Sequence, residues 1–88
     1  DPIATDDEEV NITRRSVAEL CKDIHEDLSI HDFRMVKGPT HTNLIFDVVI
    51  PFALKLSDKE VTDEIRKRIS QKWDNYYAVI EVDHSYVL

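Results

Sequence analysis

The sequence predicts an α+β fold in which two helices cover one face of a three-stranded sheet, in the order helix, strand, strand, helix, strand. Two segments place apolar residues at helical spacing, and both begin near a capping-box pattern, "TDDE" at 5–8 and "SDKE" at 57–60. Three other segments are rich in β-branched and aromatic residues, and Gly38-Pro39 separates the first two. The 88 residues are expected to form one domain, residues 1–88.

The first helix is predicted over about 6–27. Thr5 would be its N-cap, and Glu8 would reach back from the third helical position. Cys21 falls on the apolar side and is expected to be an inert core thiol, with a metal ligand or a reactive group as the alternative. A single Cys excludes both an internal disulfide and a multi-thiolate zinc site. The apolar side of this helix is formed by Val10, Val17, Leu20, Cys21, Ile24 and Leu28.

Two strands are predicted at about 29–36 and 42–50, joined as a hairpin through "KGPT". The second strand ends at Pro51, which cannot donate a ladder hydrogen bond. It is apolar on both sides except for Asp47. Alternation puts Leu44, Phe46, Val48 and Ile50 on one side, and Ile45, Asp47 and Val49 on the other.

Ile45 and Val49 therefore face away from the helices if the helices cover the other side of this strand. A few exposed β-branched residues are normal in a strand. A larger apolar face instead favours a partner, most simply a second copy of the chain, because two-fold homodimers dominate soluble assemblies.

The second helix is predicted over about 58–73, with an apolar face that steps every four residues through Val61, Ile65, Ile69 and Trp73. Asp74-Asn75 breaks this helix, and "YYAVIEVDHSYVL" at 76–88 forms the last strand. The resulting order αββαβ is the split βαβ, ferredoxin-like unit without its first strand. Both helices are then expected on one face of the sheet.

Charge and motifs narrow the classes of function. Eleven basic and eighteen acidic residues give a net charge of −7, which argues against nucleic-acid binding and suits attraction of cations. No stretch approaches the roughly 20 apolar residues of a membrane span. There is no Gly-rich phosphate loop and no nucleophile with an evident base, so an enzyme is not expected. The chain does not begin with Met and is expected to be a fragment of a longer protein.

Five side chains are candidates for a metal site on the side of the sheet away from the helices. In the last strand Glu81 and Asp83 share the face opposite to Ile80 and Val82, which suit the core. Strict alternation would place His31 with Phe33 and Met35, but strand ends often depart from it. Imidazole and carboxylate ligands without thiolate suit a borderline or hard divalent ion. The candidate ligands are His31, Asp47, Glu81, Asp83 and His84.

Each candidate also has a structural interpretation. Glu81 and Asp83 could form a solvated strand face, and His31 could be a hydrogen-bonded histidine at a strand end. His84 could be a surface residue. Asp47, an isolated acid in an apolar strand, needs a partner, and an ion pair with Lys or Arg serves as well as a metal. His25 and His41 are expected on the surface, outside any site.

The stretches "IHDFRMVKGPTHTNLIFDVVIPF", "LSDKEV" and "AVIEVDHSY" resemble the C-terminal cytoplasmic domain of cation diffusion facilitator transporters. The resemblance covers nearly the whole chain. It is most specific at His31-Asp32-x-Arg34, Gly38-Pro39-Thr40 and Val82-Asp83. It implies an αββαβ metallochaperone-like fold, a homodimer, and a tether to a six-helix membrane domain of the same chain. Such transporters exchange Zn²⁺, Mn²⁺, Fe²⁺ or a similar ion for protons, and this domain lies at the cytoplasmic face of the cell membrane.

The resemblance also implies a regulatory metal site near the dimer interface. The His of the family's His-Asp pair maps onto His31, and the Asp of the terminal strand maps onto Asp83. Two further family positions, often His, fall near Asp47 and on Glu81. The alternative function is a stand-alone ferredoxin-like regulatory or ligand-binding module. The full-length gene separates the two, because the first requires membrane spans upstream of this domain.

Overall fold

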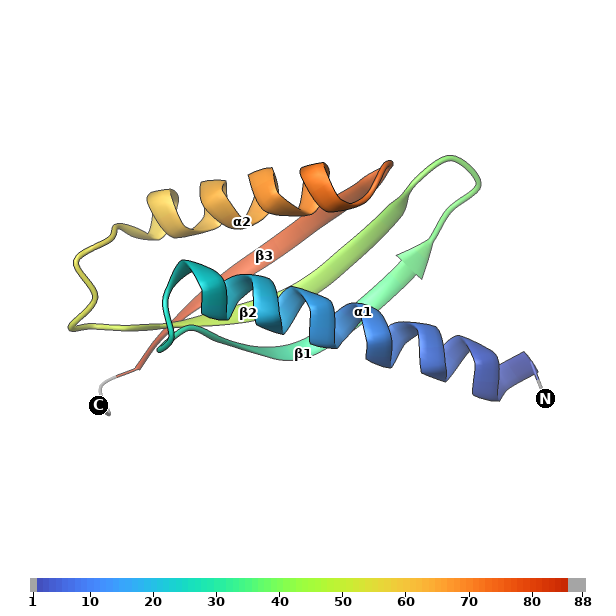
Figure 1. Cartoon of the computed structure of the whole chain (residues 1–88), viewed down its shortest axis with the longest axis horizontal. Coiled ribbons are helices and arrows are strands. Elements are labelled where there is room, and N and C mark those ends of the chain that lie inside the picture. The colour runs from blue at the N-terminus through green and yellow to red at the C-terminus, as the bar shows by residue number, and fades with distance from the viewer. Residues whose placement is uncertain (1, 86–88) are drawn as a thin grey trace.

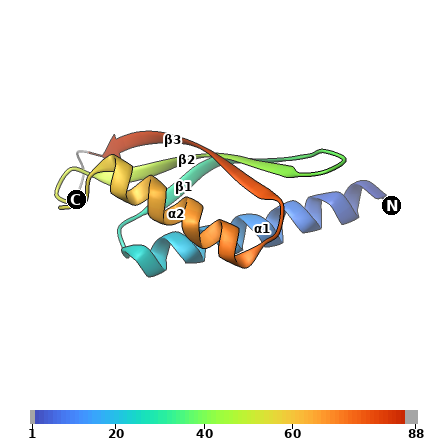
Figure 2. The ribbon, with the colours of Figure 1, turned by 90° about the horizontal axis from the view of Figure 1, so that it is seen from above.

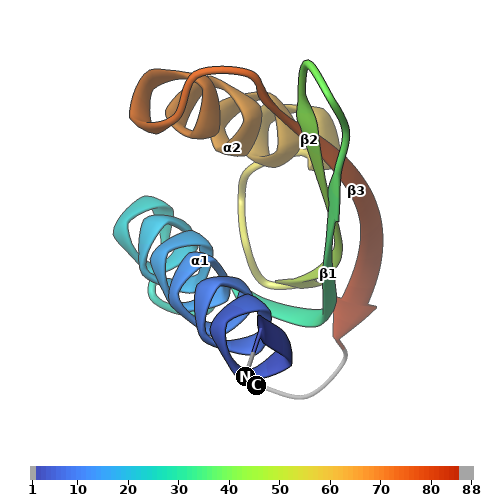
Figure 3. The ribbon, with the colours of Figure 1, turned by 90° about the vertical axis from the view of Figure 1, so that its right-hand side faces the viewer.

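The structure of the chain is a computed structural model that describes residues 2–85, with side chains described from 8 to 84. The elements follow in the predicted order (Figure 1), and both helices lie on the same face of the sheet (Figures 2 and 3). Residues 86–88 of the predicted last strand lie outside the described residues. The elements are α1 (Pro2–Ile24), β1 (Ser29–Lys37), β2 (Thr42–Pro51), α2 (Asp58–Lys72) and β3 (Tyr76–Ser85).

The sheet has the strand order β1-β2-β3. β1 and β2 form the predicted antiparallel hairpin, whereas β3 runs parallel to β2. A parallel neighbour needs a crossover connection, and α2 provides it on the helical side. β2 is therefore the central strand, with the core on one side and the uncovered face of the sheet on the other.

The core lies between the helices and the sheet. Leu44, Phe46, Val48 and Ile50 of β2 alternate as predicted and are at most 2% exposed. Ile80 and Val82 pair with Phe46 and Val48 and pack against this core from β3. The helices contribute the buried residues Val17, Leu20, Cys21, Val61, Ile65 and Ile69.

The ends of α1 differ from the sequence-based expectation. The helix begins at Pro2 instead of residue 6, so Thr5 lies inside the helix and is not its N-cap, although the Thr5 side chain is outside the described ones. Proline suits the first helical position because that position needs no N–H donor. The helix ends at Ile24, before the expected 27, and the chain turns through the 3.1 Å hydrogen bond from Leu28 N to His25 O.

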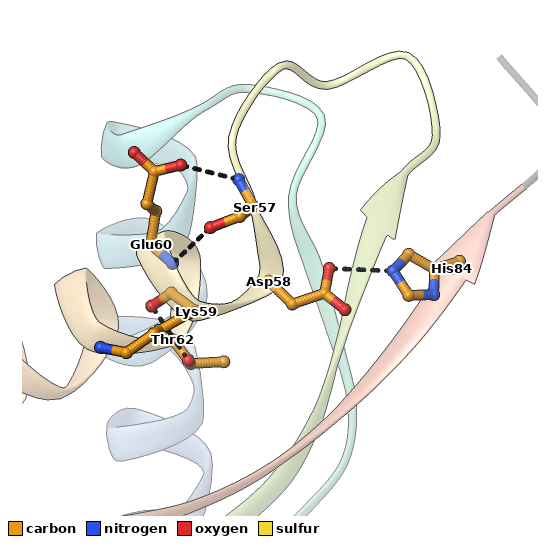
Figure 4. Close-up of polar contacts among 6 residues, drawn as sticks. All are labelled: Ser57, Asp58, Lys59, Glu60, Thr62 and His84. Atoms are coloured by element: carbon orange, nitrogen blue, oxygen red, sulfur yellow. Dashed lines mark hydrogen bonds and ion pairs between the residues drawn. The ribbon is translucent and has the colours of Figure 1, made fainter.

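The second capping box is confirmed. The Glu60 amide donates to Ser57 Oγ at 3.1 Å, and the Ser57 amide donates to Glu60 Oε1 at 3.0 Å (Figure 4). The helix ends one residue earlier than predicted, because Trp73 is the C-cap residue in an extended conformation. Trp73 is only partly buried and stacks on Tyr76 with ring centroids 5.3 Å apart. It closes the edge of the core, which corrects the expectation that it continues the buried face.

β1 contains a bulge that shifts its alternation. His31 pairs with Asp47 and Arg34 with Ile45, so β1 advances three residues while β2 advances two. Asp32 lies in this bulge with a φ of 55°, in the left-handed region that Asp tolerates better than most residues. Because of the extra residue, Phe33 faces the core and stacks on Phe46 at 5.9 Å between ring centroids.

The hairpin turn holds the far end of the two strands. Gly38 donates its amide to His41 O at 2.8 Å. A Cβ on Gly38 would lie 2.9 Å from that carbonyl oxygen, which explains why the turn uses glycine. The neighbouring Lys37 forms an ion pair with Glu9, which ties α1 to the end of β1.

Candidate functional site

The face of the sheet opposite to the helices, here called the open face, carries the candidate ligands. The strand register arranges twelve residues of this face in four rows that cross β1, β2 and β3 in that order. Two rows are mainly apolar and two carry most of the charge. The rows are Val36–Asn43–Tyr77, Arg34–Ile45–Val79, His31–Asp47–Glu81 and Ser29–Val49–Asp83.

The third of these rows, here called the acidic row, contains three of the five predicted ligands. His31 lies opposite Asp47 across the antiparallel pair, and Asp47 lies beside Glu81 across the parallel pair. The bulge in β1 is what turns His31 to this face, since strict alternation would have placed it with Phe33 and Met35. The expectation that His31, Asp47 and Glu81 share one face is therefore confirmed. The cause is the bulge in β1, which the alternation of the sequence does not reveal.

The environment of Asp47 on this face disfavours the ionised form of its carboxyl. Loss of water around its carboxyl raises its pKa, and the nearby charges of Asp83, Glu81 and Asp32 raise it further. A hydrogen bond with the Asp32 carboxyl acts in the same direction. A cation in this position would relieve the same repulsion.

A shallow, open hollow lies beside the acidic row. It is lined by Asp32, Phe33, Arg34, Asp47 and Glu81. Asp32 and Arg34 were part of the family motif but were not predicted as site residues. The signal that would have found them is the bulge, because residues 31 and 34 can share a face only if one extra residue stands between them.

Asp83 lies on the open face as predicted, in the row next to the acidic row and opposite Val49. It is not in direct register with His31. Adjacent strands are about 4.8 Å apart, so β1 and β3 are roughly 10 Å apart, and one row adds a further offset. His31 and Asp83 therefore flank β2 from opposite sides and do not converge within one chain.

His84 does not belong to this face. It pairs in register with the buried Ile50, and its Nε2 lies 2.9 Å from Asp58 Oδ1 at the start of α2 (Figure 4). Its ring stacks on Phe52 at 5.1 Å between centroids. The prediction that five groups gather on one side of the sheet is thus corrected to four, because alternation along β3 turns His84 away from Glu81 and Asp83.

The other polar candidates are placed outside the site. His25 accepts a hydrogen bond from the Asp27 amide at its Nδ1, and His41 lies edge-on to Tyr77 in the hairpin turn. Cys21 is fully buried, and burial raises the pKa of its thiol to about 11. That thiol stays protonated and unreactive at neutral pH, as its position in the core suggested.

The donor set suits a divalent cation in its chemistry but is spread out in one chain. Carboxylate oxygens with one imidazole fit ions such as Mn²⁺, Fe²⁺ or Zn²⁺. Among the described side chains, however, no three His, Cys, Asp or Glu residues come together closely enough to hold a metal ion. The acidic row extends across the full width of the sheet.

Comparisons with known proteins give a match in structure but not in sequence. No family model and no curated protein matches the chain. Two solved structures of CzrB, a protein assigned to zinc transport, share its fold. The first is 23% identical with a TM-score of 0.71, over 89% of this chain and 94% of that one. The second, a zinc form, is 21% identical with a TM-score of 0.72, over 92% and 90%.

No helix in the described part of the chain, residues 2–85, is long and apolar enough to cross a membrane. The structural likeness extends over nearly the whole of each chain compared. The chain therefore has the αββαβ, ferredoxin-like fold of the CzrB structures, which is the fold implied by the resemblance to cation diffusion facilitator cytoplasmic domains.

Proposed function

We propose that this chain is the cytoplasmic dimerisation and metal-sensing domain of a divalent cation efflux transporter of the cation diffusion facilitator family. The observation that carries the proposal is the acidic row, His31–Asp47–Glu81, aligned by the strand register on the sheet face that neither helix covers. The fold of the chain is shared with a protein assigned to zinc transport, one structure of which is a zinc form.

A homodimer would cover the open face and complete its set of metal ligands. The open face presents Val36, Tyr77 and Val79, each more than half exposed, together with the partly exposed Ile45 and Val49. Contiguous apolar surface of this kind is typical of an interface. The same face carries acids that do not converge within one chain. A second copy facing it would cover the apolar residues and bring in the missing ligands.

The proposed metal response is electrostatic. The carboxyls of Asp47, Glu81, Asp83 and Asp32 repel one another, as the raised pKa of Asp47 indicates. Two acidic faces therefore resist close approach. A divalent ion held by His31, Asp83, Glu81 and Asp47 would reverse the local charge and favour the closed dimer. Only a higher affinity for the closed state allows the metal to shift this equilibrium.

The proposal places this domain on the cytoplasmic side of the membrane, attached to a transmembrane domain of the same chain that carries the transport site. Closing of the dimer would be passed to the membrane helices. Zn²⁺, Mn²⁺ and Fe²⁺ all suit the donor set, because it lacks thiolate and is rich in carboxylate. The domain itself would bind and signal without catalysing a reaction.

Calorimetric titration with Zn²⁺ and with Mn²⁺ tests the metal-sensing part of the proposal. The wild-type domain should bind at sub-millimolar to millimolar metal, and His31→Ala and Asp83→Ala should each weaken binding. His25→Ala removes an imidazole from outside the open face and should titrate like wild type. Absence of binding in wild type at millimolar metal, or equal titration of all four proteins, would exclude the regulatory site and leave only dimerisation.

A further inference from the structure

We propose that Arg34 of one copy pairs with the β3 carboxylates of a second copy, Glu81 first and Asp83 next to it. The open face would then be a self-complementary interface in which β1 of each copy lies over β3 of the other. This inference rests on the proposed dimer, and it names the residues that align its two halves.

Arg34 is the only Lys or Arg among the twelve residues of these four rows. The guanidinium is exposed, and within its own row Arg34 is followed by the apolar Ile45 and Val79. It lines the hollow with Asp47 and Glu81 but forms no ion pair with any side chain in the described range 8–84. An arginine with a planar fork of donors beside apolar residues is well suited to a carboxylate supplied by a partner.

The charges of the open face are divided between its two edges. His31 and Arg34 lie on β1, and Glu81 and Asp83 lie on β3. Asp32 is the acid of the β1 side and lines the hollow together with Asp47. The β1 side therefore carries the only arginine of these rows, the β3 side carries two acids, and Asp47 lies between Ile45 and Val49 on β2.

This division selects one of two simple ways to stack two copies face to face. A two-fold axis across the strands would place β1 over β1 and β3 over β3. Arg34 of one copy would then lie near Arg34 of the other, and the β3 acids of the two copies would lie near each other. An axis along β2 places β1 over the other copy's β3, where Arg34 needs to reach only one row to meet Glu81. Like charges in contact across an interface are unfavourable, so the second arrangement, which leaves only the two Asp47 side chains in like-charge contact, is favoured.

The axis along β2 also has a consequence at the centre of the interface. Asp47 of each copy comes nearest to Asp47 of the other, so the centre remains repulsive while the edges attract. The two Arg34 pairs would hold the copies in register before any metal binds. A cation bound beside this centre, between His31 and Asp47 of one copy and Glu81 and Asp83 of the other, would then tighten an interface that is already aligned.

Charge reversal tests the pairing, with sedimentation equilibrium of the purified domain at low salt as the readout. Arg34→Glu should raise the dimer dissociation constant by on the order of 10- to 100-fold, because two like-charge contacts replace two pairs. Glu81→Arg should do the same. The double variant Arg34→Glu/Glu81→Arg restores opposite charges and should recover most of the affinity. Arg66→Glu makes the same charge change on the exposed surface of α2 and is the control.

The outcomes are distinguishable. A monomeric wild-type domain would remove the proposed dimer together with this inference. A wild-type dimer that Arg34→Glu weakens no more than Arg66→Glu would overturn the inference alone, and so would a double variant as weak as either single one. Circular dichroism melting of each variant checks that a loss of affinity is not a loss of fold.

Discussion

His31 lies directly opposite Asp47 on the face of the sheet that neither helix covers, although strict alternation along β1 would turn it into the core. One inserted residue, Asp32, accounts for the difference. Its φ of 55° bends the strand so that His31 and Arg34 share the open face while Phe33 stacks on Phe46. The candidate site thus depends on a backbone feature at a single position.

Substitution of Asp32 tests the bulge. Asp32→Gly should raise the free energy of unfolding by about 0.5–1 kcal/mol, since glycine adopts a positive φ without a steric cost and the change also removes a carboxyl from the cluster. Asp32→Val should lower it by about 1–2 kcal/mol, because a β-branched residue is strained there. Urea unfolding measures both. Each variant loses the carboxyl, so equal effects of the two would show that the backbone conformation is not strained.

Asp47→Asn tests the repulsion within the acidic cluster. The pKa of Asp47 is raised in the folded state, so the folded protein holds this proton more tightly than the unfolded chain does. Ionising Asp47 lowers the free energy of unfolding. This loss is absent below the ordinary pKa of a carboxyl, and it grows as the pH rises through the raised pKa of the folded state. The variant should therefore gain stability relative to wild type at neutral pH and lose this advantage in acid.

Urea unfolding between pH 3 and pH 8 measures that difference. Glu19→Gln makes a similar carboxyl-to-amide change on the exposed surface of α1 and is the control. If Asp47→Asn were less stable than wild type at neutral pH, Asp47 would instead contribute a favourable interaction as an anion.

Local sequence signals predicted most of the fold. The helical spacing of Val61, Ile65 and Ile69, the Ser57–Glu60 capping box and the alternation of β2 each produced the element that the structure contains. These signals depend on residues within one or two turns of each other. Thr5-x-x-Glu8 has the same pattern as the second capping box but lies inside α1, because Pro2 also suits a helix start and lies upstream.

The site was less predictable, because it depends on pairing between strands. The bulge decides which face of the sheet His31 occupies. The alternation of residues along β1 does not by itself indicate that a bulge is present. His84 was expected beside Asp83 because it is the next residue, but its contacts are with Asp58 and Phe52, which precede it by more than 25 residues in the chain. Such long-range contacts are invisible to spacing rules.

Phe46 and Trp73 should differ in their contribution to stability. Phe46 is 1% exposed at the centre of the core, and Phe46→Ala should cost about 3–5 kcal/mol. Trp73 lies at the edge of the core and stacks on Tyr76, so Trp73→Ala should cost only about 1–2 kcal/mol. Denaturant unfolding compares the two. An equal loss for both variants would place Trp73 within the core after all.

Ser57→Ala should destabilise the domain by about 1 kcal/mol, because the Glu60 amide loses its acceptor at the start of α2. Ser57→Asp preserves an acceptor and should remain within a few tenths of a kcal/mol of wild type. Ser70→Ala, which removes an exposed hydroxyl near the other end of α2, is the control. A loss for Ser57→Ala no greater than that for Ser70→Ala would show that the capping box contributes little.

Sedimentation equilibrium with and without metal is the sharpest test of a metal-responsive dimer, since it measures dimerisation and its response to a cation in one experiment. The wild-type domain should be a dimer at micromolar concentration in chelator, and Mn²⁺ or Zn²⁺ should lower the dissociation constant by at least roughly tenfold, which is about 1.4 kcal/mol. Asp83→Ala should keep the dimer but lose most of the metal effect. A mass near the 10.3 kDa of a single chain at high micromolar concentration, with and without metal, would contradict the account.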